Sequence, residues 1–422
     1  PETTMRKIIA VLAMAVTLTS NADANDQATT STSLSEQLRP FCSEQTWLDL
    51  QKPPPISKQI VTQSIEAART YYLNQQKTEG NFTYALDIST GDVFEDDNAV
   101  RQAGALWGLA CLNRDRFNEP TRRAVILGLD FFAKKTRALP SGEAATVYGE
   151  DETISTGMVA LYCLSIIDFI TGQEKFLPED VLKRFRLQLD IHLHYLRSME
   201  MADGSWARVY DVPSGYREPV ASAYYDGECL LAYCKAARYL GKTELIPRIN
   251  DALPKLIKRY TLDCWQPGGD RELSKGFYQW GCMAFNEYQQ AGWEPHGDLA
   301  RHSAIALSWW LLHENQLASR QGNTSYAIEG LVAAWHCAKA LNDQSAMTSI
   351  RRNCEDIMAN LISWQYGGPL MQHNPYLSSL DRVPPKAFGG ITSSRDSSVV
   401  RIDIVQHQVH AMLMMLNAFY QE

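Results

Sequence analysis

The chain has 422 residues, of which 45% are hydrophobic and 21% are charged, and this composition is typical of a folded globular protein. Its formal net charge is −8, so a nucleic acid is not expected as a partner, because phosphate binding requires a basic surface. No phosphate-binding glycine loop and no regular set of metal ligands is recognisable. We therefore expect neither an organic cofactor nor a metal site.

The first residues have the layout of a secretory signal peptide. Met5 is followed by Arg6 and Lys7, then by an apolar run from residue 8 to 18 and the small-residue segment 22–24. We expect residues 1–24 to be a leader that directs export to the periplasm or the cell exterior. Residues 25–55, rich in Ser, Thr and Gln, are expected to be a flexible linker, and residues 56–422 one domain without a membrane-spanning helix.

Apolar spacing of three and four residues predicts twelve helices along that domain. Ser57 and Asp97 stand at helix starts, where a side-chain oxygen can cap the first turn, and no strand-rich region is recognisable. The expected helices span residues 57–76, 97–113, 119–135, 151–170, 178–200, 219–240, 243–260, 277–290, 298–315, 324–341, 344–364 and 401–420.

A glycine recurs at the same place in five of the six even-numbered helices, just ahead of an apolar run, at Gly104, Gly157, Gly227, Gly281 and Gly330, and the sixth fits if Gln408 replaces the glycine. Such a repeat indicates one supersecondary unit used many times. Short turns follow these helices and longer loops precede them, which favours six antiparallel hairpins closed into an (α/α)6 barrel. The glycine-bearing helices should form the inner ring, and the long loops should gather on one face.

The segments EGNFTYALD with DDNAVRQAGALWGLA, and DGSWARVYD with YYDGECLLAYC, resemble those of the α/α-toroid superfamily over roughly residues 57 to 420. The resemblance is greatest to the six-hairpin carbohydrate-active enzymes, namely glycoside hydrolases, uronate lyases and sugar epimerases. It implies an oligo- or polysaccharide substrate. DGSW also resembles the repeat of terpene-cyclase toroids, but the acidic segment 95–97 matches their signature poorly.

Carboxylates at the entrances of the inner helices are the candidates for glycoside hydrolysis, which needs one acid and one ionised carboxylate. We favour Asp226 and Glu150 for these roles, and Asp97 is equally well explained as a helix cap. A lyase or epimerase would instead use a base such as His407 or Tyr224 to remove a proton next to a uronate carboxylate.

Substrate-binding candidates lie in the long loops and at the same helix entrances. Arginine suits an acidic sugar, although internal ion pairs explain the same residues, and aromatic side chains suit sugar rings, with Trp206 the first choice. The full set is Arg101, Arg208, Arg217, Trp206, Tyr84, Tyr210, Trp265, Trp280, Glu329 and Asp403.

From these patterns we rank three candidate functions. An exported glycoside hydrolase acting on an acidic or uronate-containing glycan comes first. A uronate lyase or sugar epimerase comes second, and a non-catalytic glycan-binding or assembly protein comes third.

Overall fold

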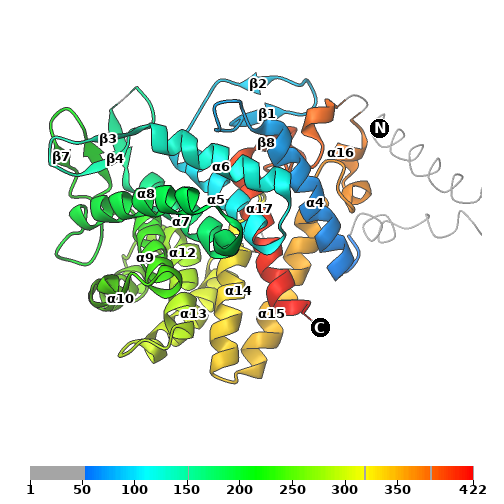
Figure 1. Ribbon diagram of the computed structural model, residues 1–422. Coiled ribbons are helices and arrows are strands. Elements are labelled where there is room, and N and C mark those ends of the chain that lie inside the picture. Colours follow the sequence, from blue (N-terminus) through cyan, green and yellow to red (C-terminus); the bar gives the residue numbers. More distant parts are fainter. Residues whose placement is uncertain (1–52, 151, 318–319, 381–382, 422) are drawn as a thin grey trace, which may run out of the picture.

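Six helices form a closed inner ring, which confirms the (α/α)6 fold class (Figure 1). The computed structural model describes residues 53–150, 152–317, 320–380 and 383–421. Each inner helix packs against the next, and the last returns to the first. In ring order they are α5 (Ala99–Asp115), α7 (Thr156–Gln173), α9 (Ala223–Leu240), α12 (Arg271–Gln290), α14 (Ser325–Ala340) and α17 (Ile402–Phe419).

An outer helix covers each inner one, and five of these pairs are hairpins joined by the expected short turns. The sixth pair joins the first and last long helices of the described chain, α4 and α17. The outer helices are α4 (Lys58–Gln75), α6 (Glu119–Lys134), α8 (Glu179–Ser198), α10 (Ile246–Tyr260), α13 (Gly297–Trp309, continued by a π-helical turn Trp310–Glu314) and α15 (Gln344–Ile362). Short helices α11 (Leu262–Trp265) and α16 (Pro375–Ser378) lie in connecting loops.

Several helix starts differ from expectation: α7 begins at Thr156 rather than near residue 151, and α9 at Ala223 rather than near residue 219. Helix α12 begins at Arg271 rather than near residue 277, because Asp270 caps it by accepting a hydrogen bond from the Glu272 amide at 3.0 Å. Ser57 caps α4 as expected, but Asn98 rather than Asp97 caps α5, through the Arg101 amide at 3.0 Å.

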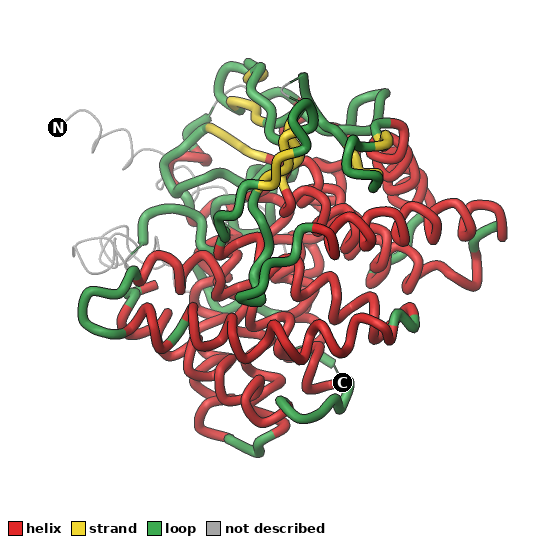
Figure 2. Tube along the Cα trace, turned by 90° about the vertical axis from the view of Figure 1, so that its left-hand side faces the viewer, coloured by secondary structure: helices red, strands yellow, loops and turns green. Residues whose placement is uncertain are grey.

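Three small antiparallel sheets, which the sequence did not predict, occupy the long loops at one end of the barrel (Figure 2). Their strands have only two or three residues, too few to show an alternating pattern. One sheet has the order β2-β1-β8, from Val93–Phe94, Ala85–Asp87 and Val399–Arg401. The second pairs β3 (Thr136–Ala138) with β4 (Ala144–Thr146), and the third has the order β5-β6-β7, from Thr153–Ser155, Val209–Asp211 and Tyr216–Arg217.

The repeated glycines lie where inner helices touch. A Cβ on Gly227 of α9 would stand 2.5 Å from the Trp280 Cβ of α12, and one on Gly330 of α14 would stand 2.6 Å from the Tyr278 ring of α12. A Cβ on Gly157 of α7 would meet Tyr225 of α9 at 2.3 Å. The repeat is therefore explained by close helix packing, with glycine selected for its lack of a side chain.

Replacing Gly227 with Ala is expected to destabilise the fold by about 1–3 kcal/mol, because a Cβ there has no room and the neighbouring backbone must shift. Chemical denaturation of the purified variant measures this free energy. Gly297→Ala is the matched control, since its Cβ would find the nearest heavy atom at 3.6 Å, an ordinary contact. Equal stability of the two variants would contradict the packing argument.

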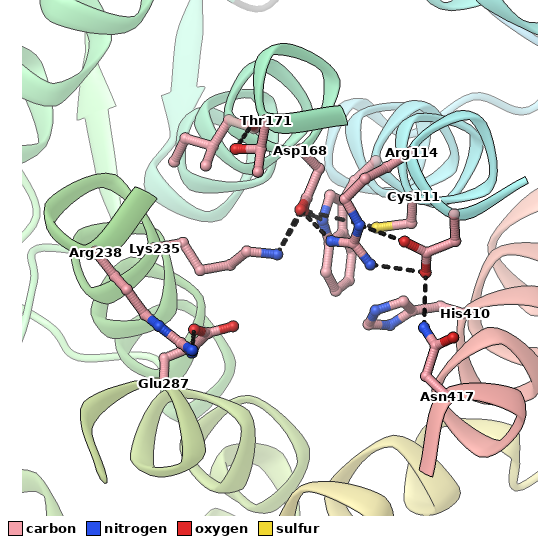
Figure 3. Close-up of polar contacts among 12 residues, drawn as sticks. Cys111, Arg114, Asp168, Thr171, Lys235, Arg238, Glu287, His410 and Asn417 are labelled. Carbon is pink, nitrogen blue, oxygen red and sulfur yellow. Dashed lines mark hydrogen bonds and ion pairs between the residues drawn. The ribbon is translucent and has the colours of Figure 1, made fainter. Parts of the chain in front are cut away.

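A buried charge cluster crosses the barrel in the C-terminal halves of three inner helices (Figure 3). Both carboxylate oxygens of Asp168 on α7 accept hydrogen bonds from the Lys235 Nζ of α9, at 2.6 and 2.7 Å. The Arg114 guanidinium of α5 pairs with the same carboxylate, and the Trp107 indole donates to it at 2.7 Å. Burial alone would raise the pKa of Asp168, but Lys235 and Arg114 hold that pKa far below its usual value.

Helix α7, together with the turn that follows it to Phe176, is long and apolar enough by composition to cross a membrane. It is the only such segment in the described ranges, and it lies buried as an inner helix of the ring. The eight described cysteines are all buried and none forms a disulfide, so they pack as small apolar side chains.

Candidate functional site: a cleft at the N-terminal ends of the inner helices

A cleft of about 520 Å³ opens at the N-terminal ends of the inner helices, and all six of them contribute to its lining. Hairpin connectivity makes these helices parallel, so their first turns and the preceding loops meet at one end. The lining combines aromatic and charged side chains, a composition suited to a polar ring compound.

His407 of α17 lies on the floor of this cleft and is held by a buried carboxylate. The Glu329 side chain of α14 has no solvent exposure, and its Oε2 lies 2.9 Å from His407 Nδ1 while its Oε1 lies 2.6 Å from His410 Nδ1. Burial alone would raise the pKa of Glu329, but the two histidines lower it below its usual value. Gln279 also donates to Glu329, so both carboxylate oxygens are engaged.

This contact defines the chemistry that His407 can perform. A neutral imidazole that donates its Nδ1 proton to Glu329 carries its lone pair on Nε2. The His407 side chain is 22% exposed and lines the cleft, whereas His410 packs beneath it against Trp107, with ring centroids 4.4 Å apart. A neutral imidazole held in this way could accept a proton at Nε2, with the Glu329 carboxylate fixing its orientation.

A second group in the cleft combines two guanidiniums with one carboxylate. Arg401 donates to Asp403 through Nε at 3.0 Å and Nη2 at 2.9 Å, and the Arg101 Nε lies 3.4 Å from the same carboxylate. Arg101 also contacts the Tyr84 hydroxyl. The three charges leave a net charge of about +1, so this wall of the cleft attracts an anion.

The remaining lining includes Glu228 of α9, which is 3% exposed, and the aromatic residues Tyr224, Trp280 and Tyr326. Burial raises the pKa of Glu228 well above its usual value. Tyr224 is half exposed and Trp280 packs beside His407, with centroids 6.1 Å apart. Such side chains present flat apolar faces beside the polar groups.

The cleft brings together five of the residues singled out from sequence: His407, Tyr224, Arg101, Trp280 and Asp403. Glu329 lies directly beneath them and Tyr84 contacts Arg101. Glu228 was one of several acidic residues at a helix entrance, and no spacing rule distinguished it from the others. What distinguishes Glu228 from Asp226 is which neighbouring helix the glycine of α9 contacts in the folded ring.

The other residues from that set lie outside the cleft lining. Asp97 accepts from Tyr148 and Gln102, Glu150 is exposed, and Trp265 stacks on Trp310. Arg208 pairs with Glu218 and Arg217 with Glu143, so the internal ion pairs considered for these arginines do form. The Trp206 and Tyr210 side chains are buried in the loop region, where the Tyr210 hydroxyl bonds to Ser141 at 2.8 Å.

Asp226 and Glu329 each stand immediately before a repeat glycine, but Asp226 points away from the cleft whereas Glu329 points toward it. Gly227 faces the next helix of the ring, α12, whereas Gly330 faces the preceding one, also α12. Because the inner helices are parallel, this difference in facing sends the residue before Gly227 outward and the residue before Gly330 inward. Asp226 instead accepts from the Trp206 amide at 2.9 Å and the Tyr260 hydroxyl at 2.5 Å.

Burial raises the pKa of Asp226 to about 7, above its ordinary value of 3.8. The folded state therefore binds a proton that the unfolded state has released, and stability falls as pH rises between about 4 and 7, by about 4 kcal/mol at most. Asp226→Asn should flatten this part of the profile. Urea denaturation of both proteins across this pH range measures the difference, and parallel profiles would contradict the assignment.

Among the described residues, no group of three His, Cys, Asp or Glu side chains is arranged to hold a metal ion.

Comparison with known proteins supports the fold. No protein-family model and no curated protein sequence matches the chain. Similar solved structures include a D-mannose isomerase (TM-score 0.60, 12% identity, covering 86% of this chain and 98% of that one). A sugar epimerase from a ruminal bacterium has a TM-score of 0.56 at 9% identity, covering 86% of this chain and 99% of that one.

A GH76 α-mannanase, BT2949 from Bacteroides thetaiotaomicron, has a TM-score of 0.52 at 9% identity, covering 85% of this chain and 96% of that one. These are α/α-toroid carbohydrate-active enzymes, so the resemblance seen in the sequence is confirmed at the level of fold. Identities this low carry no information on the reaction.

Proposed function

We propose that this protein is a carbohydrate-active enzyme that transfers a proton on an acidic sugar, as an isomerase or epimerase, with His407 as the base. The observation that carries the proposal is His407 on the cleft floor, oriented by the buried Glu329 at 2.9 Å. Removal of a proton from carbon needs a base with a fixed lone pair. The named D-mannose isomerase and sugar epimerase are consistent with such chemistry on this fold.

The substrate class that we propose is supported by the wall opposite α9. Arg101 and Arg401 together carry one more positive charge than Asp403 neutralises. A sugar carboxylate placed there would gain a charge-assisted hydrogen bond. This supports a uronic acid or another anionic sugar, and the aromatic residues of the cleft provide faces for its ring.

Glycoside hydrolysis is the second candidate, because two carboxyl groups also lie in the cleft. Burial favours Glu228 in its neutral form, the form that donates a proton in hydrolysis. Asp403 would have to serve as the second carboxylate, but the guanidiniums of Arg101 and Arg401 already engage it. We therefore place hydrolysis after proton transfer, the reverse of the order drawn from sequence.

The test is incubation of the purified protein in D2O with a panel of neutral aldoses, uronic acids and uronate-containing polysaccharides. Carbon-bound deuterium in a sugar that is otherwise intact supports the proposal. Release of new reducing ends would indicate hydrolysis, and an ultraviolet-absorbing unsaturated uronate would indicate elimination. Binding of a sugar without any of these reactions would contradict an enzymatic role and favour a glycan-binding protein.

We also propose export to the periplasm or the cell exterior. The support is the signal-peptide layout from Met5 to Ala24, which lies outside the described residues. N-terminal sequencing of the protein recovered from a bacterial host should find a start near Asn25. Recovery of the uncleaved chain from the cytoplasm would contradict it.

A further inference from the structure

Glu228 has no evident structural role. Its Oε2 is enclosed and accepts no hydrogen bond from any side chain or backbone group in the described ranges. A buried polar atom without a partner costs about 1–3 kcal/mol, so its retention in a well-packed barrel calls for a reason. The same residue lines the cleft.

The neighbouring helix leaves space for this carboxyl. A Cβ on Gly157 of α7 would stand 2.4 Å from the Glu228 Oε2. Any other residue at position 157 would push against the carboxyl or against the Tyr225 ring. The absence of a side chain at Gly157 of α7 therefore leaves the room that the Glu228 carboxyl occupies at the edge of the cleft.

Asp226, two residues earlier on α9, is a buried acid whose hydrogen bonds indicate a structural role, and it provides a comparison for Glu228. It is also buried and its pKa is also raised, but its two oxygens accept hydrogen bonds from Trp206 and Tyr260. Two residues turn a helix by about 200°, so the two acids face opposite sides of α9. Asp226 faces the outer layer and Glu228 faces the cleft.

Glu228 and His407 both line the cleft and come from opposite helices of the ring. Helices α9 and α17 are three positions apart in the ring of six, which is the greatest possible separation. A sugar in the cleft would therefore have the imidazole on one side and the carboxyl on the other. This is the placement that a proton relay through the substrate needs.

We propose that Glu228 is the catalytic acid that donates a proton to the carbonyl oxygen of the sugar while His407 removes the adjacent C–H proton. The C–H electron pair forms a carbon–carbon double bond, the carbonyl electron pair moves to oxygen, and that oxygen takes the Glu228 proton to give an enediol. In the reverse sense, the Glu228 carboxylate takes a proton from a hydroxyl and His407 returns one to carbon. No oxidant or reductant is consumed. The step rests on the proposed function.

The experiment compares Glu228→Gln with Asp226→Asn, which removes an equally buried acid from the same helix. On whichever sugar of the panel the wild type converts, E228Q should lower kcat by at least about 100-fold with KM within about threefold, because the amide binds but cannot donate a proton. D226N should stay within about threefold of wild type. E228Q retaining more than half the wild-type kcat would overturn the proposal while leaving the role of His407 intact.

A second measurement does not depend on activity. At about pH 6, above the ordinary glutamate pKa of about 4.3, the infrared difference between wild type and E228Q should contain a protonated-carboxyl band, and D226N should keep that band. Absence of the band from this difference would overturn the proposal. Absence of sugar conversion by the wild type would instead overturn the proposed function, and the assignment of Glu228 would fall with it.

Discussion

Replacing His407 with Gln is expected to lower kcat by about 10²- to 10⁴-fold, the usual contribution of a positioned acid–base group. Gln keeps a polar side chain in the cleft but has no lone pair basic enough to take a proton from carbon. The Glu329 carboxylate retains its contacts with His410 and Gln279, so the fold should persist. Deuterium incorporation into the sugar, followed by NMR, measures the loss.

His302→Gln is the control for this experiment. His302 is exposed on α13, where its ring contacts the Asp298 carbonyl at 2.8 Å, and its replacement should leave kcat unchanged. Glu329→Gln should also lower kcat, because the amide can present an N–H to Nδ1 and so select the wrong tautomer. Activity of H407Q within twofold of wild type would remove His407 from the mechanism.

Replacing Asp168 with Asn is expected to destabilise the protein by about 3–5 kcal/mol, the range for breaking a buried ion pair from one side. The Lys235 side chain is 6% exposed, and the substitution would remove its ion-pair partner (Figure 3). Arg114 would keep its second partner, Asp115, at 2.6 Å. Urea denaturation with circular dichroism measures the free energy of unfolding.

The double variant Asp168→Asn with Lys235→Met provides the control, since it removes both charges from the same site. Most of the lost stability should return, and the difference gives the coupling between the two residues. A double variant as unstable as D168N alone would show that the cost lies in packing around Asp168. In wild type, the contribution of this carboxylate should be lost as pH falls below the ordinary aspartate value of about 4, because its pKa is lower in the folded state.

The helices and their order could be predicted because each carries its own signals. Apolar spacing, caps such as Ser57 and the repeat glycines are local features, and a ring of hairpins follows from alternating loop lengths. The start of α12 was missed because no apolar spacing marks residues 271–276, and Asp270 supplies the cap. The three small sheets were missed because their strands have only two or three residues, and because two of the pairings, β1 with β8 and β5 with β6, join segments distant in sequence.

Within the site, the sequence by itself determined that acidic, basic and aromatic residues would meet at the entrances of the inner helices, because parallel helices and long loops place them there. Only the tertiary structure decided which of them face the cleft. The rotation of α9 and α14 places their repeat glycines against the bulky Trp280 and Tyr278 of α12. Through this rotation Asp226 joins the outer layer, Glu228 enters the cleft, and Glu329 lies behind His407.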